Sequence, residues 1–170
     1  MASLPKPAVA AILAARGTLP PPPGAGGRRA LERQRADVLS SVPFFAGLSK
    51  RHVRQLAADA REIDATAGDV IVQAGQPGRG FFVVLEGRAK VVGPRGRAVA
   101  SLGVGDHFGE LALLDGGPRT ASVVAETDLV VMTLPRQTFR RMLKKDHAVA
   151  AKLLETLASI IRRQSPLPSE

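Results

Sequence analysis

The 170-residue chain contains no cysteine, no tyrosine and no tryptophan. The absence of cysteine excludes disulfide bonds and thiolate zinc sites. Because aromatic residues make up only 4% of the composition, a core has to be built from valine, leucine, isoleucine, alanine and six phenylalanines. No apolar run approaches the length of about 18 residues that a membrane-spanning helix needs, so we predict no such helix.

The motifs of several enzyme classes are also missing. His52, His107 and His147 are scattered, and no His-x-His or His-x-x-x-His pair offers metal-ligand spacing. The glycine-rich stretch 75–80 is not followed by the Lys-Ser/Thr of a P-loop, and no Gly-x-Ser-x-Gly nucleophile elbow occurs. We therefore predict that the chain is not an enzyme and holds neither a metal nor a cofactor.

The net charge of +9 is distributed unevenly. Residues 1–60 carry nine basic and three acidic side chains, residues 61–135 carry seven and nine, and residues 136–170 carry eight and three. Basic flanks of this kind suit an acidic protein, a membrane surface or nucleic acid, or serve only to keep a protein in solution. The charge pattern sets the middle of the chain apart from both flanks.

Residues 1–27 have the composition of a linker. They hold six of the thirteen prolines, four of them in a row at 20–23, and glycines follow directly. Proline runs favour extended polyproline II structure and glycines are flexible, so we predict a disordered arm over 1–27. A polar helix or linker is expected over 28–38.

Residues 61–135 alternate short apolar runs with glycine turns. The apolar runs cover 70–72, 81–85, 89–92, 98–102, 123–124 and 129–134. This spacing predicts a small antiparallel β-roll of about eight strands. The expected fold class is α+β, mainly β, with helices at both ends of the roll.

Helices are predicted on both sides of the roll. Ser49 is a good N-cap for a helix over 50–60, whose apolar residues recur at helical spacing. After Pro135 we expect one helix over 136–143 and a second, capped by Asp146, that runs to about 163. The apolar stripe of this second helix suits packing on the roll, a lid over a ligand, or a homodimer contact; it consists of Val149, Leu153, Leu157, Ile160 and Ile161.

The most informative stretch covers residues 108–123. It reads Phe108-Gly109-Glu110-Leu111-Ala112-Leu113-Leu114, and then Pro118-Arg119-Thr120-Ala121-Ser122-Val123. A guanidinium donates two parallel hydrogen bonds to an anion, and the first amides of a short helix also attract one. A carboxylate beside that anion suits a sugar hydroxyl. Within fifteen residues the chain therefore offers partners for a phosphate and a ribose together.

This stretch resembles the phosphate-binding cassette of cyclic-nucleotide-binding domains, the family of catabolite-activator and kinase-regulatory-subunit type. The resemblance covers residues 39–163, leaves 164–170 as a tail, and is absent over 1–38. It implies that Glu110 accepts from the ribose 2′-hydroxyl and that Arg119 and helix amides hold the phosphate. The implied ligand-binding residues are Phe108, Gly109, Glu110, Leu111, Ala112, Arg119, Thr120 and Ala121. A cover over the base is expected from Leu157, Ile160, Ile161, Arg162 and Arg163.

The function that follows is a cytoplasmic sensor that switches conformation on binding a cyclic nucleotide, with cyclic AMP favoured over cyclic GMP. Its output partner is an unknown downstream protein. The seven residues after Arg163 are too few for a DNA-reading module. Two alternatives stay open: a regulatory domain of a larger channel, kinase or transcription factor, and a structural β-roll that has lost binding.

Overall fold

The computed structural model describes residues 25–164. Residues 1–24 of the arm predicted over 1–27, and residues 165–170 of the tail predicted over 164–170, lie outside the described residues. From the N-terminus the elements are α2 (Ala25–Ser41), η1 (Pro43–Phe45), α3 (Lys50–Asp59), β1 (Arg61–Ala65), β2 (Val70–Val72), β3 (Gly80–Glu86), β4 (Ala89–Val92), β5 (Ala98–Leu102), β6 (His107–Phe108), α4 (Glu110–Leu114), β7 (Ser122–Ala125), β8 (Leu129–Pro135), α5 (Arg136–Lys145) and α6 (His147–Gln164).

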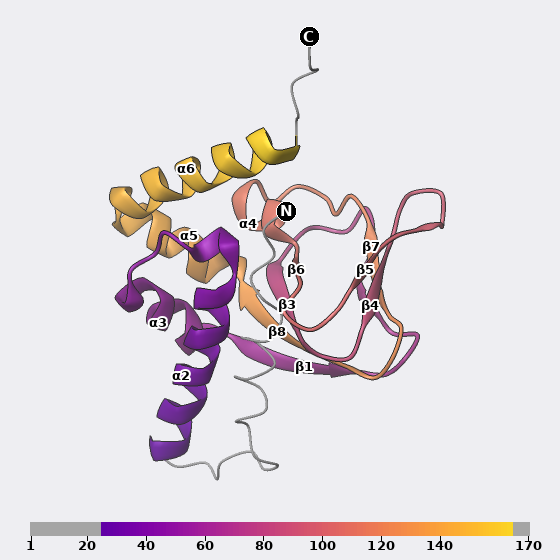
Figure 1. Ribbon diagram of the computed structural model, residues 1–170, viewed down its shortest axis with the longest axis horizontal. Coiled ribbons are helices and arrows are strands. Elements are labelled where there is room, and N and C mark those ends of the chain that lie inside the picture. The colour runs from indigo at the N-terminus through magenta and orange to yellow at the C-terminus, as the bar shows by residue number, and fades with distance from the viewer. Residues whose placement is uncertain (1–24, 165–170) are drawn as a thin grey trace.

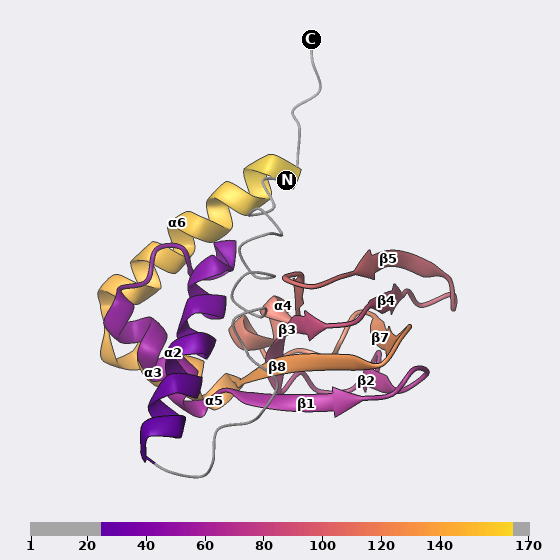
Figure 2. The same cartoon turned by 60° about the horizontal axis from the view of Figure 1, so that its bottom comes forward.

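The strands form two four-stranded antiparallel sheets. One has the order β1-β8-β3-β6 and the other the order β2-β7-β4-β5. Figure 2 shows the two sheets as the walls of a roll, with β1 and β8 on one side and β4 and β5 on the other. The predicted antiparallel roll of eight strands with flanking helices is confirmed.

The helix boundaries follow local capping. Ser49 caps α3 as predicted, because its Oγ accepts from the backbone N–H of His52 at 3.3 Å. Asp146 caps α6 in the same way, with its Oδ1 accepting from the N–H of Ala148 at 2.9 Å. The helix expected over 28–38 is longer than predicted, since α2 begins at Ala25 and ends at Ser41. Residues 25–27, which the sequence analysis assigned to the disordered arm, therefore belong to this helix.

Strand β3 divides the core into two clusters. Its side chains alternate between the two faces of the sheet, as strand geometry requires. Phe81, Val83 and Leu85 belong to a cluster shared with the helices, whereas Phe82 and Val84 point into the roll. Strand β3 is therefore buried on both faces.

The helices and the roll occupy opposite sides of the molecule. In Figure 1, α2, α3, α5 and α6 gather on the left, and β4, β5 and β7 lie on the right. The short helix α4 lies between them, next to β3 and α5. Among residues 25–164, no helix has the length and hydropathy needed to cross a membrane.

Candidate functional site

A cavity of about 320 Å³ opens where α4 and the loop after it face the sheet β2-β7-β4-β5. Its wall has a polar end and an apolar end. The polar end holds Glu110, Arg119 and Thr120, together with His107 and Asp115. The apolar end comes from the strands and consists of Val72, Val91, Leu102 and Val123. One hollow thus offers charged groups and a hydrophobic surface to the same ligand.

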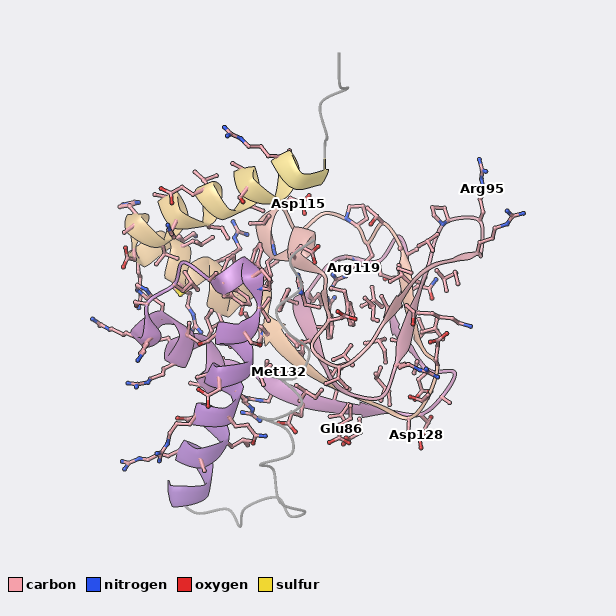
Figure 3. The ribbon with its side chains drawn as sticks, viewed as in Figure 1. Glu86, Arg95, Asp115, Arg119, Asp128 and Met132 are labelled. Atoms are coloured by element: carbon pink, nitrogen blue, oxygen red, sulfur yellow. The ribbon has the colours of Figure 1, made fainter. Side chains whose placement is uncertain are left out.

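Arg119 supplies the cation of the polar end. Its Nη2 donates to the carbonyl oxygen of Gly80 at 2.8 Å, and its guanidinium carbon lies 5.7 Å from the centre of the Phe82 ring. Burial lowers the pKa of Arg119 from its usual value, and the negative charge of Glu110 acts to raise it. An arginine with lowered pKa still stays protonated at neutral pH. Figure 3 labels Arg119 between α4 and the strands of the roll.

The backbone of Arg119 is fixed by the loop that follows β2. Its carbonyl oxygen accepts from the N–H of Gly75 at 2.8 Å, and its own N–H donates to the carbonyl oxygen of Gln76 at 2.9 Å. A third bond in the same ladder joins the N–H of Gly78 to the oxygen of Gly117 at 3.2 Å. The position of the Arg119 side chain is therefore set by a backbone whose N–H and carbonyl groups are both hydrogen-bonded.

Gly109 is needed for two separate reasons. Its φ is +89°, a region that residues with a Cβ rarely adopt. A Cβ at this position would lie 2.6 Å from Nη1 of Arg119 and 2.9 Å from the oxygen of Gly80. Glycine thus lets the backbone turn and lets the guanidinium approach it closely.

The residues around Gly109 connect the polar end to the core. Phe108 stacks on Phe82, with ring centres 4.9 Å apart and planes inclined by 11°. Glu110 is the first residue of α4, and Leu111 and Ala112 follow in the same helical turn. Of the residues predicted to bind a ligand, six line the cavity, namely Phe108, Gly109, Glu110, Arg119, Thr120 and Ala121, and Leu111 and Ala112 continue the helix that begins at Glu110.

His107 is a polar residue that sequence reasoning did not assign to the site. Its ring lies 5.5 Å from that of Phe81, on the face of β3 that carries the helices. Burial lowers the pKa of His107, while the carboxylates of Glu110 and Asp106 act to raise it. His107 thus adjoins the polar end without being an evident ligand group.

Sequence reasoning also missed the apolar end of the cavity. Val72, Val91, Leu102 and Val123 come from four different strands, so only their pairing in the sheet brings them together. The signal that could have found them is the inward alternation along β2, β4, β5 and β7. Asp115 was missed as well; its Oδ1 accepts from the N–H of Gly117 at 2.8 Å and shapes the return loop.

None of the described side chains of the predicted cover over the base lines the cavity in this structure. Leu157 packs against the helical cluster, Ile161 is 61% exposed, and Arg162 is exposed. The side chains of Ile160 and Arg163 lie outside the described part of the structure. In the part of the chain that is described, no group of three or more acidic or histidine side chains could hold a metal ion.

Comparison with known proteins places this site in a family. The family model of the cyclic nucleotide-binding domain matches residues 62–146, half of the chain. A cAMP-dependent protein kinase regulatory subunit from Aspergillus fumigatus is 44% identical over 111 residues, which cover 62% of this chain and 26% of that relative. The chain spans about a quarter of the length of the curated relatives it matches.

Solved structures agree with the family model. The N-terminal domain of a transcriptional regulator from Streptomyces coelicolor A3(2) is 34% identical with a TM-score of 0.65, covering 75% of this chain and 92% of that one. The regulatory domain of Toxoplasma gondii PKA, solved as a co-crystal with cAMP, is 30% identical with a TM-score of 0.65, covering 77% and 51%. The chain therefore belongs to the cyclic nucleotide-binding domain family.

Proposed function

We propose that this chain binds a cyclic nucleotide reversibly in the 320 Å³ cavity and acts as a regulatory domain. The observation that carries the proposal is the lining of this cavity, which joins Arg119 and Glu110 to apolar side chains from four strands. The volume lies at the small end of the range found for small-molecule sites. A cyclic nucleotide has the same two parts as this lining, because its sugar phosphate is polar and anionic and its base is flat and largely apolar.

Arg119 is the proposed phosphate ligand. Its guanidinium already lies in the wall, and a half-buried cation attracts a permanently charged phosphodiester more strongly than an exposed one. Backbone amides of Gly109, Leu111 and Ala112 are proposed to donate to the same phosphate. Glu110 would accept from the ribose 2′-hydroxyl, which gives a carboxylate beside an anion a favourable role.

The base is proposed to lie against the apolar end, formed by Val72, Val91, Leu102 and Val123. Thr120, which lines the cavity, would reach the 2-amino group of a syn guanine but not an anti adenine. We favour cyclic AMP over cyclic GMP, because one hydroxyl contact contributes only about 0.5–1.5 kcal/mol. The names of the kinase relatives support the same choice.

The proposed output is a conformational switch of the C-terminal helices. Since Ile161 and Arg162 are exposed and do not line the cavity, α6 has to move before it covers a bound base. A ligand shifts such an equilibrium only by its difference in affinity for the two states. The exposed residues Leu154 and Ile161 on α6 are also available to a second copy or to a downstream protein. We propose regulation rather than catalysis, in the cytoplasm, either as a free-standing sensor or as part of a longer protein.

The first test is calorimetry with cyclic AMP and cyclic GMP on the wild type and on Arg119→Leu. Truncating one partner of a buried charge pair costs about 2–5 kcal/mol, so affinity should fall well over tenfold. Arg95→Leu is the matched control, because Arg95 is exposed in the turn between β4 and β5 and does not line the cavity. A wild type that binds neither nucleotide would leave the chain as a structural β-roll.

The second test assigns the ribose contact. Glu110→Ala should weaken cyclic AMP but change the affinity for 2′-deoxy cyclic AMP very little. The comparison is a double-mutant cycle with one change in the protein and the other in the ligand. An equal loss for both ligands would contradict the assignment of Glu110 to the 2′-hydroxyl.

A further inference from the structure

The first turns of α6 pack against η1, which precedes the roll in the sequence. Val149 and Leu153 are buried beside Phe44 and Phe45 of η1. The aliphatic chain of Lys152 lies so close to Gly47 that a Cβ there would collide with it. By contrast, Leu154 and Ile161 are 67% and 61% exposed. Helix α6 is thus held at its N-terminal end.

A polar contact lies at the corner where α5 ends and α6 begins. Nε2 of His52 is 3.1 Å from Oδ2 of Asp146, and the two side chains are only 19% and 38% exposed. Asp146 ends α5 with extended backbone, at φ −137° and ψ 101°, and it also caps α6 through its other oxygen. One carboxylate therefore joins α3 to the first turn of α6.

The other ring nitrogen of His52 is also occupied. Nδ1 lies 3.0 Å from Oγ of Ser49, the residue that caps α3. With the proton on Nε2, the imidazole donates to Asp146 and accepts from the Ser49 hydroxyl. The ring is therefore held at both ends, and it fixes the start of α3 to the start of α6.

We propose that His52 is a positioning residue which holds α6 away from the nucleotide cavity. The inference rests on the proposed function and adds an element that controls it. No described side chain of α6 lines the cavity, so closure over a bound base requires the joint at Asp146 to move. The His52–Asp146 contact stabilises the open arrangement and opposes that movement. Loss of the contact should shift the population toward the closed form before any ligand is present.

The test measures nucleotide affinity and dissociation rate for two variants. His52→Ala removes the contact from α3, and Asp146→Ser removes the carboxylate oxygen that faces His52 while keeping a hydroxyl cap for α6. A partly exposed polar contact of this kind has a small effect, so each variant should bind cyclic AMP about two- to fivefold more tightly and release it more slowly. The double variant should show no further gain, since both changes remove the same contact. His147→Ala is the control, because His147 is exposed at the first position of α6.

A merely structural role would lower the melting temperature without tightening binding. Unchanged or weaker binding by folded variants, with a wild type that binds, would overturn the proposal while leaving the proposed function intact. A distance measurement on the ligand-free protein tests the proposal even if the wild type binds no cyclic nucleotide. Because the chain has no cysteine, spin labels can be placed at Ala100→Cys and Ala158→Cys, both exposed positions. His52→Ala should add a second distance between β5 and α6, and a single unchanged distance would overturn the proposal.

Discussion

The two faces of the central strands β3 and β8 are buried by different means. On the helical face, twenty buried residues of the described chain form one cluster that includes four of the six phenylalanines. On the roll face the cluster has nine buried residues, and beside it lies the 320 Å³ cavity. Close packing stabilises the first face, and incomplete packing leaves room for a ligand at the second. We therefore expect stability and binding to respond to different residues.

The two sides also differ in charge. Residues 25–60 and 136–164, which form the helical side, hold fifteen basic and five acidic residues, whereas residues 61–135 hold seven and nine. The cavity thus lies in the part of the molecule with a slight excess of negative charge. Under the proposed function, attraction of an anion into the cavity would depend on Arg119 at close range and not on a general positive field.

The largest effect on stability is expected from Phe139→Ala. Phe139 is fully buried on the helical face, with ring centres 5.9 Å from Phe44 and 6.1 Å from Phe45. Truncation of a buried phenylalanine costs about 3–5 kcal/mol in the free energy of unfolding. Urea denaturation should show this loss, while the folded fraction keeps its affinity for cyclic nucleotide.

Phe82→Leu is the counterpart on the roll face. Phe82 supports the Arg119 guanidinium at 5.7 Å and stacks on Phe108, so we expect weaker binding and a smaller loss of stability. If Phe139→Ala impaired binding as strongly as Phe82→Leu, the two faces would not be functionally separate.

Gly109→Ala should weaken binding strongly, with a smaller effect on the fold. The added methyl group would meet Nη1 of Arg119 and the oxygen of Gly80, and φ of +89° would be strained. Arg119 would have to leave its place in the wall, so affinity should fall by more than tenfold. Gly96→Ala is the matched control: its φ is +72° and a Cβ there meets nothing within 4 Å. Equal losses of affinity in the two variants would show that backbone strain at positive φ weakens binding and that displacement of Arg119 does not.

Much of the fold was accessible from the sequence because its signals are local. Ser49 and Asp146 cap helices through their own side chains, and glycines mark the turns between strands. Strands β1 and β6 gave weaker signals. β1 contains three charged residues among five, and β6 has only two residues, so both depend on pairing with β8 and β3.

The polar end of the site was predictable for the same reason, since residues 108–121 are contiguous. The apolar end was not, because Val72, Val91, Leu102 and Val123 meet only through the strand order β2-β7-β4-β5. The contact between His52 and Asp146 joins residues 94 positions apart in a way that no spacing rule encodes. Long-range placement of this kind has to come from the folded structure.

A modest effect is expected from Thr120→Ala. Thr120 lines the cavity but is exposed, so its loss should leave the melting temperature unchanged. A single neutral hydrogen bond contributes about 0.5–1.5 kcal/mol, and the affinity for cyclic GMP should fall by about two- to tenfold. Cyclic AMP should be affected less. Parallel losses in calorimetry would mean that Thr120 serves the phosphate and that the base is selected elsewhere.

The smallest effect concerns the pH dependence of stability and involves His107, whose ring lies beside Phe81 on the helical face of β3. Burial lowers the pKa of His107 in the folded protein below its value in the unfolded chain. Between these two pKa values the unfolded state binds more protons, so the free energy of unfolding should fall as the pH is lowered from 7 toward 5. His107→Gln removes this proton linkage, and urea unfolding across that range should show a shallower slope than in the wild type. His147→Gln, at an exposed position, is the matched control. An unchanged slope in His107→Gln would contradict this prediction. It would mean that the carboxylates of Glu110 and Asp106 stabilise the protonated ring enough to offset the effect of burial.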